Sequence, residues 1–151
     1  MSVEFGAATR ADLPQLVALL GVLFSQEAEF VPDDAKQARA LEKILADESV
    51  GRIHVARDGA KVVAMASLLY SISTAEGGLA ASFEDLVVLP GYRGKGVGKA
   101  LLQHVIAEAR KQGVLRLTLL TDSQNKRAQA LYRKLGFVDS PMKPMRLKLK
   151  P

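Results

Sequence analysis

The chain has 151 residues, of which 48% are hydrophobic and 25% charged, a size and balance typical of one globular domain. Its net charge of +5 is unevenly spread, since residues 1–90 hold 7 Lys/Arg and 13 Asp/Glu, whereas residues 91–151 hold 14 Lys/Arg and 3 Asp/Glu. The absence of cysteine and the presence of only two histidines exclude disulfides, a cysteine nucleophile and a thiolate or histidine-rich metal site.

The sequence begins without a basic region followed by an apolar run, and no segment reaches the roughly 18 apolar residues of a membrane span. We therefore expect a single cytoplasmic domain over 1–151, with no metal and no membrane contact.

The first half of the chain predicts a strand, two helices and three more strands. Thr9 and Asp12 have the spacing of a helix-capping box, and apolar residues follow at helical intervals. Pro32 opens a second helix, and Asp58-Gly59 is a hairpin signal. The expected strands cover 3–8, 52–57, 62–72 and 79–89.

Pro90 and Gly91 end the last of these strands and lead into a glycine-rich loop. The alternation of strand and helix patterns predicts an α/β (α+β mixed) fold. The elements expected beyond the loop are helices over 97–112 and 125–135, and strands over 114–120, from 137, and over 145–149.

Gly94, Gly96 and Gly98 lie at alternate positions between an expected strand and an expected helix. Glycine permits positive φ and lets a ligand approach the backbone closely. The first N–H groups of the following helix have no internal partner and lie at the positive end of the helix dipole. With the basic residues of 93–99, this pattern predicts a cradle for a phosphate-rich ligand, although a flexible turn has a similar composition.

Two standard nucleotide-binding loops do not fit. A P-loop needs Lys-Ser/Thr after its last glycine, whereas Val97-Gly98 follows Gly96. A dinucleotide-binding fold needs G-x-G-x-x-G near its first strand, whereas these glycines read G-x-G-x-G after about four strands.

Two blocks of the sequence resemble the GNAT superfamily of N-acetyltransferases. They are SFEDLVVLPGYRGKGVG over 82–98 and NKRAQALYRKLGF over 125–137, and their separation and the order of elements also fit. The resemblance covers essentially the whole chain. It implies a mixed, mostly antiparallel twisted sheet of about six to seven strands, flanked by about four helices, with two central parallel strands splayed at the cofactor site.

The resemblance implies acetyl-CoA as co-substrate and assigns its contacts to three segments. The strand around Val87 would bond the pantetheine arm through its backbone, the glycine loop would hold the pyrophosphate, and the 125–137 block would line the far wall. The residues so assigned are Leu86, Val87, Val88, Arg93, Gly94, Lys95, Gly96, Val97, Gly98, Lys99, Asn125, Ala128 and Tyr132.

Tyr132 and Glu84 are the expected catalytic residues. By the resemblance, Tyr132 protonates the departing thiolate, and a phenol with the reference pKa near 10 can do so; the alternative is a core tyrosine packed against Phe137. Glu84 is the expected general base that removes a proton from the amine, with a surface acid as the alternative. Strand alternation puts Glu84 on the face of Leu86 and Val88, unless a bulge intervenes.

The transfer would be direct, by attack of a primary amine on the thioester in a ternary complex. Family acceptor sites draw on the first two helices, where acids such as Glu27 suit a small cationic amine, for example a polyamine; a solvated helix end is the alternative. The acceptor could equally be a protein amine. We also expect a homodimer by analogy with the family, through the terminal strand over 145–149.

Two other functions remain open. A non-catalytic CoA-binding sensor would keep the fold, although Glu84 and Tyr132 argue against it. A nucleic-acid-binding module would suit the pI of 9.6, but aromatic residues make up only 5% of the chain and no basic-aromatic stripe appears. We therefore expect no nucleic-acid partner.

Overall fold

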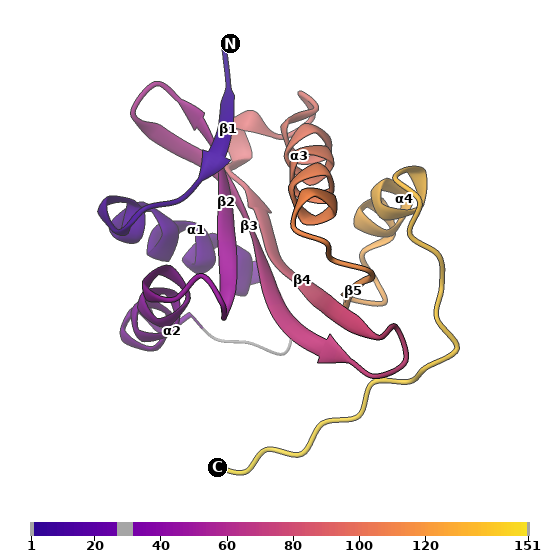
Figure 1. Cartoon of the computed structure of the whole chain (residues 1–151). Helices are drawn as coiled ribbons and strands as arrows, with labels where there is room; N and C mark the ends of the chain where they lie inside the picture. The colour runs from indigo at the N-terminus through magenta and orange to yellow at the C-terminus, as the bar shows by residue number, and fades with distance from the viewer. Residues whose placement is uncertain (1, 27–31, 151) are drawn as a thin grey trace. The chain divides into compact units, whose positions relative to one another are not determined.

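A computed structural model describes residues 2–26 and 32–150. The chain divides into two compact units, Met1–Leu120 and Thr121–Pro151, shown in Figure 1. The first unit contains β1 (Glu4–Ala7), α1 (Leu13–Gln26), α2 (Asp34–Ala46), β2 (Gly51–Asp58), β3 (Lys61–Ser73), β4 (Gly78–Val88), α3 (Val97–Lys111) and β5 (Leu117–Leu119), with short 3-10 turns η1 (Arg10–Asp12) and η2 (Pro90–Tyr92). The second contains α4 (Lys126–Lys134).

The sheet has the order β1-β2-β3-β4-β5. Its first four strands pair antiparallel, and β4 pairs parallel to β5. The predicted mixed, mostly antiparallel sheet with four helices is therefore confirmed. The described residues form five strands instead of six or seven.

The two strands predicted near the C-terminus are wrong. Residues 137–150 form no strand, although Met145, Leu147 and Leu149 alternate with basic residues. These three side chains are 82–91% exposed. Alternation predicts a strand only where a neighbouring strand accepts its hydrogen bonds and covers its apolar face, and the second unit supplies no such neighbour.

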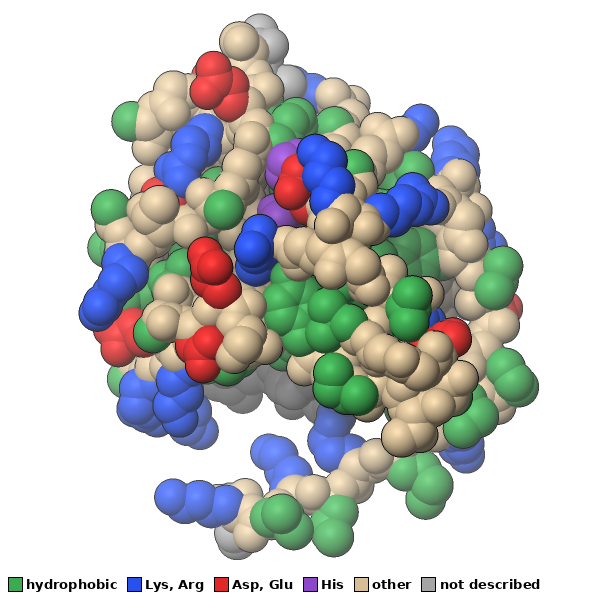
Figure 2. All heavy atoms as spheres, viewed as in Figure 1, with side chains coloured by type: hydrophobic (Ala, Val, Ile, Leu, Met, Phe, Trp, Pro, Cys, Tyr) green, Lys and Arg blue, Asp and Glu red, His purple; other side chains and the backbone are tan. Residues whose placement is uncertain are grey.

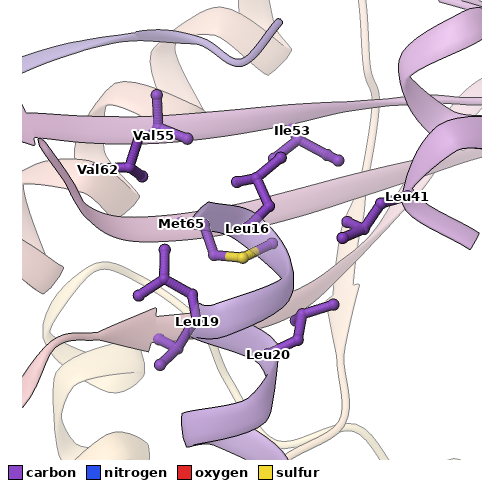
Figure 3. Packing of buried hydrophobic residues seen from close by; sticks show 9 residues of the cluster. Leu16, Leu19, Leu20, Leu41, Ile53, Val55, Val62 and Met65 are labelled. Carbon is purple, nitrogen blue, oxygen red and sulfur yellow. The ribbon is translucent and has the colours of Figure 1, made fainter. Parts of the chain in front are cut away.

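Helices cover both faces of the sheet (Figure 1). On one face, leucines of α1 and α2 pack against β2, β3 and β4 in a core cluster that Figure 3 shows. The opposite face receives α3, whose inward residues Val97, Leu101, Leu102, Val105 and Ala109 are buried. None of the helices in the described part of the chain is long and apolar enough to cross a membrane.

The start of α1 is fixed to β2 by a paired charge. The carboxylate of Asp12 is 5% exposed and receives the Thr9 N–H at 2.8 Å and two bonds from the Arg57 guanidinium at 2.7 and 2.6 Å. Hydrogen bonding from Arg57 is the largest effect on the pKa of Asp12 and lowers it below the ordinary value. Thr9 and Asp12 thus form the predicted capping box, at the start of η1, the 3-10 turn that leads into α1.

Candidate functional site

A β-bulge interrupts β4 within the segment expected to bind the cofactor. Val87 and Glu84 pair with residues of β3 that are only two apart, so Asp85 and Leu86 together occupy the place of one residue. Asp85 has a φ of 57°, a left-handed conformation in which Asp and Asn are enriched among non-glycine residues.

The bulge decides which face of the sheet carries Glu84. Simple alternation groups Glu84 with Leu86 and Val88, but the extra residue moves it to the face of Val87 and Met65. That face packs against α1 and α2. The expected grouping was wrong because a bulge shifts the period-two pattern by one residue. Glu84 is exposed on the α1 and α2 side.

The two parallel strands part after a short contact. Among the described residues, β4 and β5 pair only over Ala81–Phe83 and Leu117–Leu119, so Leu86–Val88 lie beyond the paired stretch. The sheet edge along these three residues therefore presents backbone groups that an extended ligand can bond, as an added strand would, but the Val88 carbonyl already accepts from Arg93. Val87 is buried, whereas Leu86 and Val88 are half-buried.

The glycine loop lies between the end of β4 and the start of α3. Gly94 and Gly96 have φ of 76° and 81°, angles that other residues adopt at a cost. A Cβ at either position would meet nothing within 4 Å, so the backbone angle, not crowding, requires glycine there. The open space also leaves the loop backbone accessible to a ligand.

α3 begins without a side-chain cap. Gly96 is its N-cap residue, and its first turn contains no acidic residue. The N–H groups of the first turn lack helical acceptors, as at any helix start, and the N-cap residue offers no side chain in their place. Lys95 and Lys99 are exposed beside them. Such a helix start favours an anion, and the phosphate cradle stays a prediction.

Arg93 connects the loop to its neighbours. Its Nε donates to the carbonyl of Val88 at 3.0 Å. When the Gln26 amide is oriented with its oxygen toward Arg93, that oxygen accepts from the two terminal guanidinium nitrogens at 2.6 and 3.2 Å. Arg93 therefore fastens the loop to β4 and to the end of α1, in addition to supplying positive charge.

Asn125, Ala128 and Tyr132 belong to the second unit. The Asn125 side chain accepts the Ala128 N–H at 3.1 Å and caps α4. The ring of Tyr132 meets that of Phe137 edge to face at 5.9 Å, so the packing considered as an alternative role of Tyr132 does occur. The expected acceptor residue Glu27 lies outside the described residues.

Two side chains beside the loop were not selected from the sequence. The Tyr92 hydroxyl donates to the Asp58 carboxylate at 2.6 Å, and this bond raises the pKa of Tyr92 above its ordinary value. The residues are 34 positions apart, so no local pattern could reveal the contact. The only indication of a role for Tyr92 in the sequence was its position next to Arg93.

The described residues offer no group of three or more His, Cys, Asp and Glu side chains able to hold a metal ion. On the face seen in Figure 2, Lys and Arg side chains are dispersed among acidic and apolar ones.

Comparison with known proteins identifies the family to which the chain is similar. The model of the acetyltransferase (GNAT) family matches residues 16–137. Glucosamine 6-phosphate N-acetyltransferase of Trypanosoma brucei brucei is 31% identical over 144 residues, covering 91% of this chain and 90% of that protein. The [ribosomal protein bS18]-alanine N-acetyltransferase of Escherichia coli K12 is 40% identical over 63 residues, covering 42% of this chain and 43% of that protein.

The fold has solved counterparts as well. An integron cassette protein from the mobile metagenome of Cole Harbour Salt Marsh superimposes with a TM-score of 0.85 at 31% identity, covering 97% of this chain and 91% of that one. The family match spans well over half of the chain and includes β4, the glycine loop and the start of α3. The chain therefore belongs to the acetyltransferase (GNAT) family.

Proposed function

We propose that the chain transfers the acetyl group of acetyl-CoA to a primary amine by direct attack in a ternary complex. The observation that carries this proposal is the continuity of two binding features along one segment. The sheet edge at Leu86–Val88 is followed in the chain by η2 and the glycine loop, which lead to the uncapped helix start at Gly96. An extended arm that ends in a pyrophosphate matches both features in that order.

The residues present fit acetyl-CoA. Backbone groups of Leu86–Val88 would bond the pantetheine arm, as the edge of a sheet bonds an added strand. Loop residues from Arg93 to Lys99 would hold the pyrophosphate through N–H groups and positive charge. Asn125, Ala128 and Tyr132 are assigned to the far wall by the family resemblance. Bound there, acetyl-CoA supplies a thioester carbonyl that is open to attack.

Glu84 and Tyr132 are proposed to move the protons. Glu84 would take a proton from the ammonium of the acceptor, directly or through water, so that the neutral amine attacks the acetyl carbon. The C–N bond would form, the C–S bond would break, and the Tyr132 hydroxyl would give its proton to the departing thiolate. The nitrogen would then lose its second proton to water, and a proton from water would restore the Tyr132 hydroxyl, so that one net proton is released with the amide and the free thiol. A backbone N–H of β4 would stabilise the oxyanion. The bulge supports the role of Glu84, because it puts this acid on the α1 and α2 side of the sheet.

The acceptor is proposed to be a small primary amine. Two acidic residues at the start of α2, Asp33 and Asp34, would attract a positively charged acceptor. They therefore support a cationic amine such as a polyamine. The Trypanosoma brucei brucei relative is a glucosamine 6-phosphate N-acetyltransferase, which makes glucosamine 6-phosphate the natural competitor. The two differ in the sign of the charge beside the amine, so one assay distinguishes them.

The test is a thiol-release assay with acetyl-CoA and a panel of spermidine, glucosamine 6-phosphate and lysine, preceded by calorimetric titration with CoA. We expect binding, and release on one amine only. Glu84→Gln and Tyr132→Phe should each lower kcat by about 10²-fold while CoA affinity stays within twofold. Absence of CoA binding would overturn the proposal, and unchanged kcat in either variant would remove that residue from the mechanism.

We also propose that two copies associate through the segment over 145–149. Its three apolar side chains are strongly exposed and alternate with Arg146, Lys148 and Lys150, the pattern of a strand with one covered face. Sedimentation of the full chain and of the Leu147→Asp variant tests this: a dimer that becomes a monomer is expected, and a monomer in both would contradict it.

A further inference from the structure

The β2–β3 turn touches the glycine loop through one short hydrogen bond. Asp58 is the last residue of β2, and Tyr92 is the last residue of η2, directly before Arg93. The Tyr92 hydroxyl donates to Oδ2 of Asp58 at 2.6 Å. A tyrosine with the reference pKa near 10 is protonated at neutral pH, so the hydroxyl donates there, and the bond to Asp58 raises the pKa of Tyr92 above that value.

The turn that carries Asp58 is itself held by α1. The Gln15 amide donates to the carbonyl of Ala60 at 3.3 Å and accepts the N–H of Val62 at 2.8 Å, and so spans the turn. One residue before Asp58, Arg57 is bonded to the buried carboxylate of Asp12. Asp58 is thus a fixed anchor, because the contact before it reaches Asp12 at the end of η1 and the contacts after it reach Gln15 in α1.

Two cations from different segments share the ring of Tyr92. Nζ of Lys61, the first residue of β3 directly after the turn, lies 5.7 Å from the ring centre, and Nζ of Lys95, from the loop, lies 5.8 Å from it. Both distances allow a cation–π attraction. The ring therefore joins the turn to the loop through its two lysines as well as through its hydroxyl.

The loop needs such a restraint because of its glycines. Gly94 and Gly96 give the chain access to many backbone conformations, and only a few of these direct successive N–H groups at one anion. Ordering a flexible loop at the moment of binding weakens affinity. A contact that fixes the entry of the loop beforehand therefore tightens the binding of whatever the loop holds.

We propose that Asp58 and Tyr92 are positioning residues that hold the glycine loop in the conformation that binds the pyrophosphate of CoA. The inference rests on the proposed function, since it presupposes that CoA binds there. Neither residue need touch the ligand: Asp58 acts on Tyr92, and Tyr92 acts on the backbone that follows it.

The test compares two ligands that differ in the group the loop holds. CoA contains the pyrophosphate, and pantetheine lacks it together with the adenosine. Affinity for CoA is measured by calorimetry and affinity for pantetheine by NMR titration, in the unaltered protein and in Tyr92→Phe, Asp58→Ala and Asp58→Asn. Tyr70→Phe is the matched control, because Tyr70 also hydrogen-bonds a side chain, Gln112, by its hydroxyl.

We expect Tyr92→Phe and Asp58→Ala to raise the Kd for CoA about tenfold. Asp58→Asn keeps an acceptor oxygen without the charge, so its Kd for CoA should lie between that of these two variants and that of the unaltered protein. The Kd for pantetheine should stay constant in all variants, and Tyr70→Phe should leave both values unchanged. Thermal unfolding of each variant checks that the fold persists.

Three outcomes contradict the proposal in different ways. An unchanged Kd for CoA in Tyr92→Phe and Asp58→Ala overturns the inference and leaves the proposed function intact. Equal weakening for CoA and pantetheine means that the two residues support the fold in general instead of the loop. Failure of the unaltered protein to bind CoA overturns the proposed function, and the inference falls with it.

Discussion

α3 and α4 begin in opposite ways. At the start of α4, the Asn125 side chain accepts the Ala128 N–H, whereas at the start of α3 the N-cap is Gly96, with no side-chain bond. The burial of the two helices differs in the opposite sense. α3 buries five residues against the sheet, and α4 has no buried residue.

The difference separates two ways of stabilising a helix. A capped helix with little burial gains stability from its own end, and its first N–H groups are used in doing so. A helix fixed by packing can leave those groups without a partner, where they are available to a ligand. The proposed cofactor site lies at α3, the helix that is stabilised by packing.

The largest effect should come from removing that packing. Leu101 of α3 is 0% exposed, so Leu101→Ala should lower the free energy of unfolding by about 4 kcal/mol, through lost burial and a cavity. Leu131 of α4 is only half-buried, and Leu131→Ala should lower it by about 1 kcal/mol. Urea denaturation followed by NMR signals from each helix measures both. Equal losses would contradict the distinction between the helices.

A pH-dependent effect of similar size should come from His54, under α3. Its ring nitrogens are buried without a hydrogen-bond partner in the described residues, and its ring lies 5.3 Å from that of His104 on α3. Burial, then the charge of His104, lowers the pKa of His54 from 6.5 to about 4. The unfolded chain therefore binds more protons than the folded one between these two values.

Stability should consequently be complete above pH 6.5 and fall as the pH drops toward 4, by on the order of 3 kcal/mol. The folded state is destabilised because it must keep His54 neutral while the unfolded state gains the proton. Denaturation at a series of pH values measures this. His54→Met should flatten the curve between pH 6.5 and 4, and an equally steep curve in that variant would assign the loss to another group.

A carboxylate at the start of α3 should prevent an anion from binding there. Gly96→Asp puts a carboxylate where an anion should bind, and Asp is among the residues that tolerate positive φ. CoA affinity should fall about a hundredfold by calorimetry. Gly77→Asp is the control, because Gly77 has the same φ of 81° and open space around it, but lies in the β3–β4 turn. Similar losses in both variants would show that backbone strain, and not charge, weakens binding.

Sequence patterns predicted most of the fold because most elements carry strong periods. The helices at α1 and α3 repeat leucine and valine at helical intervals, and the turn at Asp58-Gly59 has a standard hairpin composition. The strand over 145–149 was wrong for a physical reason. The alternation of apolar and basic residues shows that one face of the segment could be buried. It does not show whether another part of the chain lies against that face, and a strand forms only where one does.

The site divides in the same manner. The glycine loop was predicted because the conformations it needs select a residue type, and glycine spacing is visible in the sequence. The bulge at Asp85 was considered only as a possible exception to the alternation of the strand, because one residue in a left-handed conformation leaves no periodic signal in the sequence. The bond between Tyr92 and Asp58 joins distant segments, and only the fold brings them together.

The smallest effect should come from the cap of α4. Asn125→Ala removes the acceptor for the Ala128 N–H and should destabilise the helix by about 1 kcal/mol, because that donor then lacks a partner. Asn125→Asp keeps an oxygen at the same distance along the side chain and should restore the protection. Amide hydrogen exchange of α4 measures both, since a local loss need not alter the unfolding of the other unit. If Asn125→Ala left the exchange unchanged, the cap would not stabilise α4, and the contrast with α3 would then rest on packing alone.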